Sequence, residues 1–342
     1  MKAMVIQHVT DLQQNSHPLH FVEIRTPTPG RGEVLIRVSA CGVCHTELDE
    51  IEGRTPPAFF PMIPGHQVIG RIEDMGADVN GLAVGDRVGV AWIFSSCGEC
   101  EFCKNGYENL CRQFKATGRD ALGGYAEWMI APAASVFPIP DFFTDTEAAP
   151  LLCAGAIGFR SLRLTEIENG QSLGLMGFGA SAHLVIQMVR FKFPDTPVFV
   201  FARSEKERAF ARELGAVWTG SINDSVPVAL HAIIDSTPAW QPVVAAMKNL
   251  NPGGRLIVNA IRKENHDKNN LLSLNYPEHL WMEKEIKSVA NVTRRDVADY
   301  LVLASTMKTK PETNLYSLTD ANHALIEMKK GEIRGAKVLV IE

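Results

Sequence analysis

QSLGLMGFGASAHLVIQMV, residues 171–189, passes from a strand-like apolar run through a glycine turn into the start of a helix. Gly177, Gly179 and Ala182 occupy the three small-residue positions of the dinucleotide fingerprint G-x-G-x-x-G/A. There Gly177 permits the tight turn, and Gly179 lets the backbone approach a pyrophosphate at the helix N-terminus. The fingerprint is weak by itself, so its weight depends on the sequence that follows it.

Alternating strand and helix patterns follow this turn. VFVFA at 198–202, AIIDS at 232–236 and GRLIVNA at 254–260 have the apolar texture of buried strands, and SEKERAFAREL at 204–214 has that of a helix. Such a succession of strand–helix units predicts an α/β domain with a parallel, doubly wound sheet.

The end of the second strand bears on the choice of cofactor. An NAD site normally places Asp or Glu there to bind the ribose 2′-hydroxyl, but this chain has Ala202, Arg203 and Ser204. Arg203 can pair with a 2′-phosphate, which favours NADP(H), with NAD(H) as the alternative. Arg203 can equally be a solvated residue, and Ser204 with Glu207 forms a capping box at the start of the next helix.

Four of the seven cysteines are crowded into CGECEFCKNGYENLC, residues 97–111. Four thiolates on one short lobe can close a tetrahedron around Zn²⁺ with no open position, which is typical of a structural site. Free or disulfide-paired cysteines are the alternative, and adjacent C-x2-C pairs are poor disulfide partners outside redox enzymes. The predicted structural zinc ligands are Cys97, Cys100, Cys103 and Cys111.

The remaining cysteines lie outside this lobe. Cys41 and Cys44 are in SACGVCHTELDEIEG at 39–53, and Cys153 stands alone. His66 follows a Pro-Gly turn in PMIPGHQVIGRIEDMG at 61–76. Taken singly, a lone buried cysteine is usually a small core hydrophobe, and a histidine can simply complete a turn.

The order of these motifs resembles that of the zinc-dependent medium-chain alcohol dehydrogenases. GVCHTEL (42–48), PGHQVIGRIEDMG (64–76), the four-cysteine lobe, GGYAEW (123–128) and GFGASAH (177–183) follow one another as in that family, across essentially the whole chain. The resemblance implies an α/β protein with a GroES-like, β-rich catalytic domain at 1–155 and a Rossmann-type NAD(P)-binding domain at 156–300. It also implies that the segment 301–342 returns to the catalytic domain.

The same resemblance assigns the zinc ligands. Cys44, His66 and Cys153 look like the ligands of a catalytic zinc with an open fourth position, in addition to the structural zinc. Cys41 matches no ligand position and is expected to be a packing residue.

The implied reaction is hydride transfer between an alcohol carbon and the nicotinamide, with the catalytic zinc polarising the substrate oxygen. By resemblance Thr46 takes the alcohol proton, and Glu47 orients the zinc-bound imidazole. Asp49 stands where the relay residue is commonly His, and an aspartate is ordinarily a weaker base than a histidine. Gln67 stands where the family usually has Glu, which removes one negative charge beside the metal.

Further positions are assigned in the same way to the cofactor and the substrate. Trp92 and Ile93 are expected to line an apolar substrate pocket for a hydrophobic or aromatic, primary alcohol, although Trp92 can also be a core aromatic. Ala336 stands where many relatives have a phosphate-binding Arg, and Arg334 or Lys337 are the candidates to replace it. The full set of expected cofactor-binding residues is His45, Gly174, Gly177, Gly179, Ala180, Arg203 and Ser204.

Composition limits the partners. A net charge of −5 with scattered Lys and Arg gives no basic stripe, so no nucleic-acid partner is expected. The apolar run near 172–190 is interrupted by glycines and polar residues, and the N-terminal sequence turns polar too early for a signal peptide. We therefore expect a cytoplasmic protein with no membrane partner, acting on a small alcohol or aldehyde, and the family implies a homodimer or homotetramer.

Three alternatives remain at this stage. A zinc-free quinone or enone reductase would lack both cysteine sets, which this chain has complete. A non-catalytic zinc-binding module would need only the four-cysteine lobe. An inactive relative is suggested by Asp49 and Gln67, although neither change removes a metal ligand.

Overall fold

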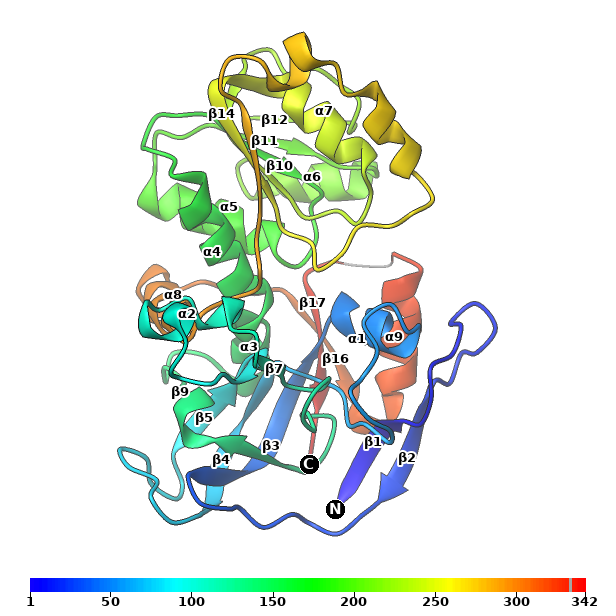
Figure 1. The fold of residues 1–342 in the computed structure, drawn as a ribbon, viewed down its shortest axis with the longest axis vertical. Coiled ribbons are helices and arrows are strands. Elements are labelled where there is room, and N and C mark those ends of the chain that lie inside the picture. Colours follow the sequence, from blue (N-terminus) through cyan, green and yellow to red (C-terminus); the bar gives the residue numbers. More distant parts are fainter. Residues whose placement is uncertain (332–333) are drawn as a thin grey trace. The chain divides into compact units, whose positions relative to one another are not determined.

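The computed structural model describes residues 1–331 and 334–342 and divides the chain into two compact units (Figure 1). The first unit combines Met1–Ala156 with Val292–Glu342, and the second is Ile157–Asn291. The chain thus rejoins the first unit at Val292, ahead of the boundary of 301 expected from sequence. The reason is α8 (Arg294–Met307), whose first residue is already bonded to the first unit: the backbone N–H of Arg294 donates to Glu108 Oε1 at 2.7 Å.

The second unit contains a six-stranded sheet in which every pairing is parallel. Its order, β12-β11-β10-β13-β14-β15, is the order 3-2-1-4-5-6 of the Rossmann fold, so the predicted sheet is confirmed. All four residues of β10 and of β11 are buried, as expected for strands covered on both faces. The strands are β10 (Leu173–Met176), β11 (Val198–Phe201), β12 (Trp218–Gly220), β13 (Leu230–Asp235), β14 (Leu250–Val258) and β15 (Glu285–Ser288).

Helices connect these strands along the chain. Helix α6 begins directly after Ser204, whose hydroxyl accepts the N–H of Glu207 while the Glu207 carboxylate accepts the N–H of Ser204, so the predicted capping box is confirmed. The helices of this region are α4 (Ala154–Thr165), α5 (Ala182–Lys192), α6 (Glu205–Glu213) and α7 (Gln241–Asn249), with short helices η4 (Lys268–Ser273) and η5 (Tyr276–Leu280) before β15.

The first unit is rich in β-structure, as expected. Its main sheet has the order β16-β17-β3-β4-β5-β9, with β8 also paired to β3, and a hairpin of β1 and β2 lies beside it in the core. The strands are β1 (Lys2–Ile6), β2 (Leu19–Glu23), β3 (Glu33–Val43), β4 (Val68–Met75), β5 (Arg87–Val90), β6 (Ile93–Ser95), β7 (Lys115–Ala116), β8 (Trp128–Pro132), β9 (Val136–Pro138), β16 (Thr313–Ser317) and β17 (Ala336–Val340). The helices are α1 (His45–Ile51), α2 (Glu101–Lys104), η1 (Glu108–Leu110), η2 (Ala133–Ser135), α3 (Asp145–Ala148), η3 (Ala149–Leu152), α8, η6 (Leu318–Asp320) and α9 (Ala321–Lys329).

The C-terminal segment completes this sheet. β17 is antiparallel to β3, with Val338 opposite Gly42 and Val340 opposite Ala40, and it is parallel to β16 on its other side. The last strand of the chain therefore lies between two others and is buried at four of its five residues.

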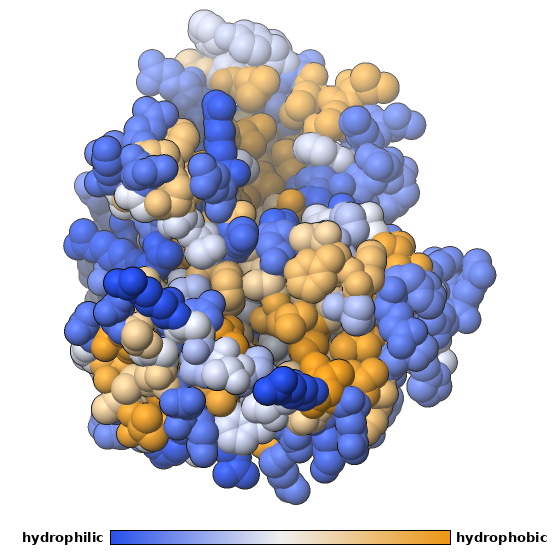
Figure 2. Space-filling view, turned by 60° about the horizontal axis from the view of Figure 1, so that its bottom comes forward, coloured by the Kyte–Doolittle hydropathy of each residue, from blue (hydrophilic) through white to orange (hydrophobic). Residues whose placement is uncertain are grey.

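None of the described helices combines the length and the apolar character needed to cross a membrane. Figure 2 shows one face of the molecule, on which hydrophilic residues are interspersed with smaller apolar patches.

The packing of α8 yields a test of the first unit. A Cβ added at Gly155 would lie 2.1 Å from Cε1 of the fully buried Tyr300 in α8. We expect Gly155→Ala to lower the free energy of unfolding by about 1–3 kcal/mol through overpacking, measured by chemical denaturation. Gly179→Ala is the control, because a Cβ there meets nothing within 4 Å. Equal stability of the two variants would contradict this packing.

Candidate metal centre and nucleotide-binding turn

Cys44, His66 and Cys153 converge in the first unit although they are far apart in the chain. The Sγ atoms of Cys44 and Cys153 are 4.0 Å apart, and His66 Nε2 is 3.3 Å from Cys153 Sγ. A tetrahedral zinc at about 2.3 Å from sulfur and about 2.0 Å from nitrogen places its donor atoms about 3.5–3.8 Å apart. The donor set therefore fits zinc in both spacing and chemistry, and three ligands leave one tetrahedral position open.

Local structure brings each ligand to this point. Cys44 follows the last residue of β3 and is the N-cap of α1, and Cys153 follows directly after η3. His66 follows Gly65, which has φ +97°. A Cβ on Gly65 would lie 2.3 Å from the Tyr125 ring and 2.9 Å from Cys41 Sγ, so this turn requires glycine. The buried Cys41 is thus a packing residue of the turn.

The carboxylate of Glu47 joins two of the ligands. Its Oε2 accepts the N–H of Cys44 at 2.6 Å, and its Oε1 lies 2.8 Å from His66 Nδ1. Both side chains are at most 1% exposed. A proton held on Nδ1 leaves Nε2 as the metal-binding nitrogen, which is the usual arrangement around zinc-bound imidazoles.

The electrostatics agree with a cation-binding centre. The hydrogen bond from Cys153 and the neighbouring His66 hold the pKa of Cys44 well below its usual value, against the effect of burial. Burial would lower the pKa of His66, but Glu47 and Cys44 hold it well above the usual value. Negative charge thus gathers around the ligand atoms, where a divalent cation is stabilised.

The four-cysteine lobe forms a second cluster. Cys97 Sγ lies 3.5 Å from Cys111 Sγ and 3.8 Å from Cys103 Sγ, and Cys100 Sγ lies 3.6 Å from Cys103 Sγ. These spacings fit a closed tetrahedral zinc site. All seven cysteines are unpaired thiols, so disulfides do not hold the lobe. Backbone N–H groups near Glu99 and Cys100 lower the pKa of Cys97 to about 6, which favours its thiolate.

In the second unit, the fingerprint glycines form the expected turn after β10. Gly177 has φ +84°, which favours glycine, while a Cβ on Gly179 would meet nothing within 4 Å. The fold does not need glycine at 179, and the open space there is a cradle that a dinucleotide can approach closely. Ala180 belongs to this turn, at the start of α5, and the exposed Arg203 precedes Ser204 at the end of β11.

Gly174 differs from this expectation, because it lies inside β10 and not at the turn. A Cβ there would meet Leu230 Cδ1 at 2.7 Å and Ile233 Cγ1 at 2.9 Å on the neighbouring strand. Its small size serves packing of the sheet.

Comparison with known proteins identifies the relatives of this arrangement. The profile described as alcohol dehydrogenase GroES-like domain matches residues 30–141. A probable alcohol dehydrogenase of Mycobacterium tuberculosis, AdhA, is 40% identical over 95% of this chain and 93% of its own length. The chain belongs to the medium-chain alcohol dehydrogenase family. An alcohol dehydrogenase of Geobacillus stearothermophilus is 31% identical over the full length of both chains.

Solved structures show the same fold. The alcohol dehydrogenase of Aeropyrum pernix superposes with a TM-score of 0.87 at 24% identity, covering 99% of this chain and all of that one. The oxidoreductase class, the GroES-like first unit and the Rossmann second unit of this family member therefore agree with the sequence analysis.

The expected proton-transfer residues of this alcohol dehydrogenase lie near the metal centre. Thr46 Oγ1 is 3.6 Å from Cys44 Sγ, which places it beside the ligands. Asp49 Oδ1 accepts hydrogen bonds from Arg54 Nε and lies 2.6 Å from Arg54 Nη2, so its carboxylate is held in an ion pair. Sequence did not indicate this partner.

Gln67 and His45 flank the same ligands. The buried Gln67 turns its amide toward β3, where a Cβ on Gly42 would lie 2.6 Å from Gln67 Oε1. His45 is exposed in the first turn of α1.

The expected substrate-pocket residues are both buried. The Trp92 ring packs edge-on against His66, with ring centroids 4.9 Å apart, and the Arg119 guanidinium lies 5.5 Å from the Trp92 centroid. Ile93 is 0% exposed and pairs with Ala116 of β7.

The two side chains that were candidates for phosphate binding, Arg334 and Lys337, bind other protein groups. Lys337 Nζ donates to Tyr316 Oη at 2.8 Å and to Glu327, and its side chain is only 5% exposed. Arg334 Nε donates to Glu312 Oε1 at 2.6 Å. The expectation that one of them replaces the missing arginine finds no support in these contacts.

Sequence reasoning missed Glu50, a fully buried carboxyl group near the metal centre. Among the described residues, neither of its oxygens has a hydrogen-bond partner. Burial, and then the charge of Glu47, hold its pKa well above the usual range, which favours its uncharged form. In HTELDEI, Glu47 and Glu50 are one helical turn apart, and this spacing could have indicated that both carboxyl groups lie on the same face of α1.

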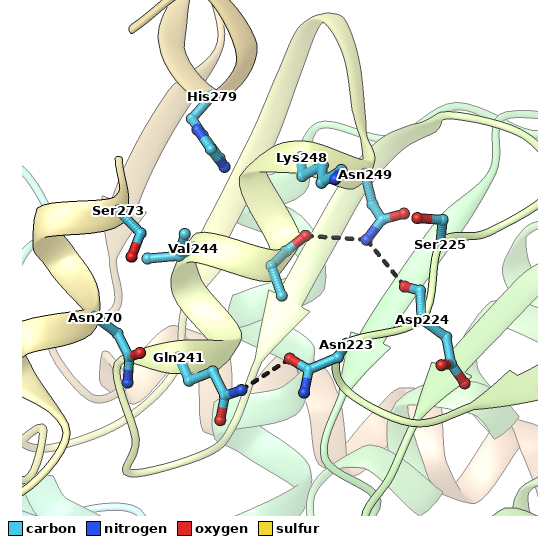
Figure 3. Close-up of a pocket in the computed structure, with 11 residues that line it drawn as sticks. Asn223, Asp224, Ser225, Gln241, Val244, Lys248, Asn249, Asn270, Ser273 and His279 are labelled. Atoms are coloured by element: carbon cyan, nitrogen blue, oxygen red, sulfur yellow. Dashed lines mark hydrogen bonds between the residues drawn. The ribbon is translucent and has the colours of Figure 1, made fainter. Parts of the chain in front are cut away.

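A separate pocket of the second unit contains none of the expected site residues. Figure 3 shows Asn249 of α7 donating to the carbonyls of Asp224 and Ala245, and Gln241 donating to Asn223. These bonds tie the loop after β12 to α7, which is a structural role.

Removal of the Glu47 bridge tests the metal centre. We expect Glu47→Ala to weaken metal binding at the three-ligand site by about 10–100-fold, because His66 loses its orienting partner. Chelator competition on the purified protein measures this, with the four-cysteine site of the same chain as internal control. An unchanged affinity would show that Glu47 does not orient the ligand.

Proposed function

We propose that this chain catalyses zinc-dependent hydride transfer between a primary, hydrophobic or aromatic alcohol and NADP(H), with NAD(H) as the less favoured cofactor. The observation that carries the proposal is the meeting of Cys44, His66 and Cys153, whose ligand atoms have spacings that suit three ligands of a tetrahedral zinc. The four-cysteine lobe would supply a closed structural site, so a second site with only three ligands supports a catalytic role.

The metal, when bound, supplies Lewis-acid polarisation of the substrate oxygen. The protein's own residues do the rest. Glu47 holds the His66 ring in place through Nδ1, and the Thr46 hydroxyl, beside Cys44, is positioned to take the proton of the alcohol. Because the Arg54 ion pair engages Asp49, we propose that protons leave Thr46 without Asp49 as the accepting base.

The cofactor proposal rests on the second unit. Open space at Gly179 allows the backbone to approach a pyrophosphate, and the nicotinamide exchanges the hydride when it is bound. At the end of β11 the chain offers the exposed Arg203 and no carboxylate, which suits a 2′-phosphate better than a ribose hydroxyl.

The substrate proposal rests on Trp92. Its buried ring packs against the imidazole of His66, so a large apolar side chain lies next to the ligand set. This favours an apolar alcohol over a polyol. The homodimer or homotetramer implied by the family stays a prediction.

Initial rates test the proposed reaction. Benzyl alcohol, a short primary alcohol and the matching aldehydes should be assayed with NAD(H) and with NADP(H), alongside the bound zinc of the same preparation. We expect turnover with NADP(H), loss of activity when a chelator empties the open site, and recovery on adding zinc. Activity that persists without zinc would contradict the proposed mechanism.

Arg203 gives a test of cofactor choice. We expect Arg203→Ala to raise KM for NADP(H) by about 10-fold or more, through loss of a charge-assisted bond, and to leave KM for NAD(H) nearly unchanged. Lys206→Ala, an exposed change on the next helix, is the matched control. Equal effects on both cofactors would rule out a 2′-phosphate contact for Arg203.

A further inference from the structure

Lys263 carries a buried ammonium group that has no place in the reaction described above. Its side chain is 7% exposed, and Nζ donates to the carboxylate of Asp235, to Thr237 O at 2.8 Å and to Ala239 O at 2.9 Å. These acceptors use all three N–H donors of a lysine. Lys263 therefore has no N–H donor left to bind a phosphate. Any effect of Lys263 on a ligand must come from the turn whose atoms it binds.

That turn, residues 235–239, follows β13 and lies against the fingerprint glycines. Ser236 donates its backbone N–H and its hydroxyl to Met176 O, at 3.0 and 3.1 Å. A Cβ on Gly177 would lie 3.1 Å from both Ser236 Oγ and Thr237 Cγ2. The two turns are thus in direct contact at the carboxyl ends of β10 and β13.

The position of this contact in the sheet is significant. β10 and β13 are neighbours, and the strand order reverses between them. In open α/β sheets, ligands bind in the crevice outside the carboxyl ends of the strands at such a reversal. The turn at 235–239 is therefore one wall of the crevice in which a dinucleotide would lie, and the glycine turn is the other.

The segment after β14 fixes this wall at several points. Besides Lys263, the N–H of Glu264 donates to Pro238 O at 2.8 Å. The carboxylate of Asp267 accepts the N–H groups of Trp240 and Gln241, at 2.7 and 2.9 Å. Among these ties, that of Lys263 pairs its charge with a fully buried carboxylate, that of Asp235.

A buried ion pair is a poor device for stability alone, because desolvation of both charges offsets their attraction. Asp235 is 0% exposed, and an apolar pair would serve packing equally well. The ammonium does something that an apolar side chain cannot do, since it also draws the two carbonyls of Thr237 and Ala239 to one point.

We propose that Lys263 is a positioning residue for the dinucleotide: it fixes the 235–239 turn as the β13-side wall of the cofactor crevice without touching the cofactor. The inference rests on the proposed function. Its signature is a loss of cofactor affinity that is separable from any loss of stability.

Two variants separate these effects. Lys263→Met removes the ammonium and leaves Asp235 buried without its counter-ion, so it should lower both the melting temperature and the affinity for cofactor. The double variant Asp235→Asn with Lys263→Met removes the uncompensated charge but does not restore the tether to Thr237 O and Ala239 O. Lys268→Met, at an exposed position of the same segment, is the control.

The dissociation constants of NADPH and NADH should be measured by calorimetry on the zinc-loaded proteins, together with kcat, KM and melting temperature. We expect the double variant to recover most of the melting temperature while its Kd and KM for cofactor stay raised by about 10-fold, since two hydrogen bonds from a charged donor are lost. Its kcat at saturating cofactor should stay close to that of the unmodified protein, and Lys268→Met should change nothing.

Recovery of both stability and cofactor affinity in the double variant would overturn the inference, because Lys263 would then only neutralise Asp235. If the unmodified protein bound neither NADPH nor NADH, the proposed function itself would fail, and the inference with it.

Discussion

The metal centre depends on one buried carboxylate. Glu47 is excluded from water, and burial raises its pKa, while the contacts with His66 Nδ1 and Cys44 N–H favour its charged form. Those same contacts fix the positions of two ligands that come from different parts of the chain. The turn at Gly65 and the first turn of α1 must therefore meet at a set distance, and the packing of Tyr125 and Cys41 against Gly65 maintains it. Gln67 is neutral and burial raises the pKa of Glu50, so the carboxylate that contacts the ligands is that of Glu47.

The second unit combines a closely packed sheet with an open crevice at the carboxyl ends of its strands. Large side chains fill the interior of β10 and β11, while Gly174 makes room for those of β13. The carboxyl ends of these strands differ from the interior of the sheet. There the glycines leave open space, and polar turns border that space. The sheet is thus rigid where it is buried and shaped by hydrogen bonds where a ligand can enter.

Residue type and spacing in the sequence were sufficient to predict the parallel sheet, the capping box at Ser204 and the four-cysteine lobe, whereas the set of Cys44, His66 and Cys153 was assigned through the family resemblance. These features depend on local chemistry or on ligand types that few other roles require. The partner of Asp49, the burial of Glu50 and the engagement of Lys337 were not predictable in this way, because each depends on which side chains meet through space. Gly174 shows the same limit within a motif, where a glycine beside the fingerprint serves packing.

The pairing of β17 with β3 has a consequence for how the protein is made. Cys44 follows β3, in which Gly42 and Ala40 lie opposite Val338 and Val340, so the strand before this ligand lacks its β17 neighbour until residues 336–340 have been synthesised. The second unit, Ile157–Asn291, contains all of its own strands and emerges from the ribosome earlier. The second unit can therefore fold first, and the sheet beside the three-ligand site becomes complete only after β17 has been synthesised.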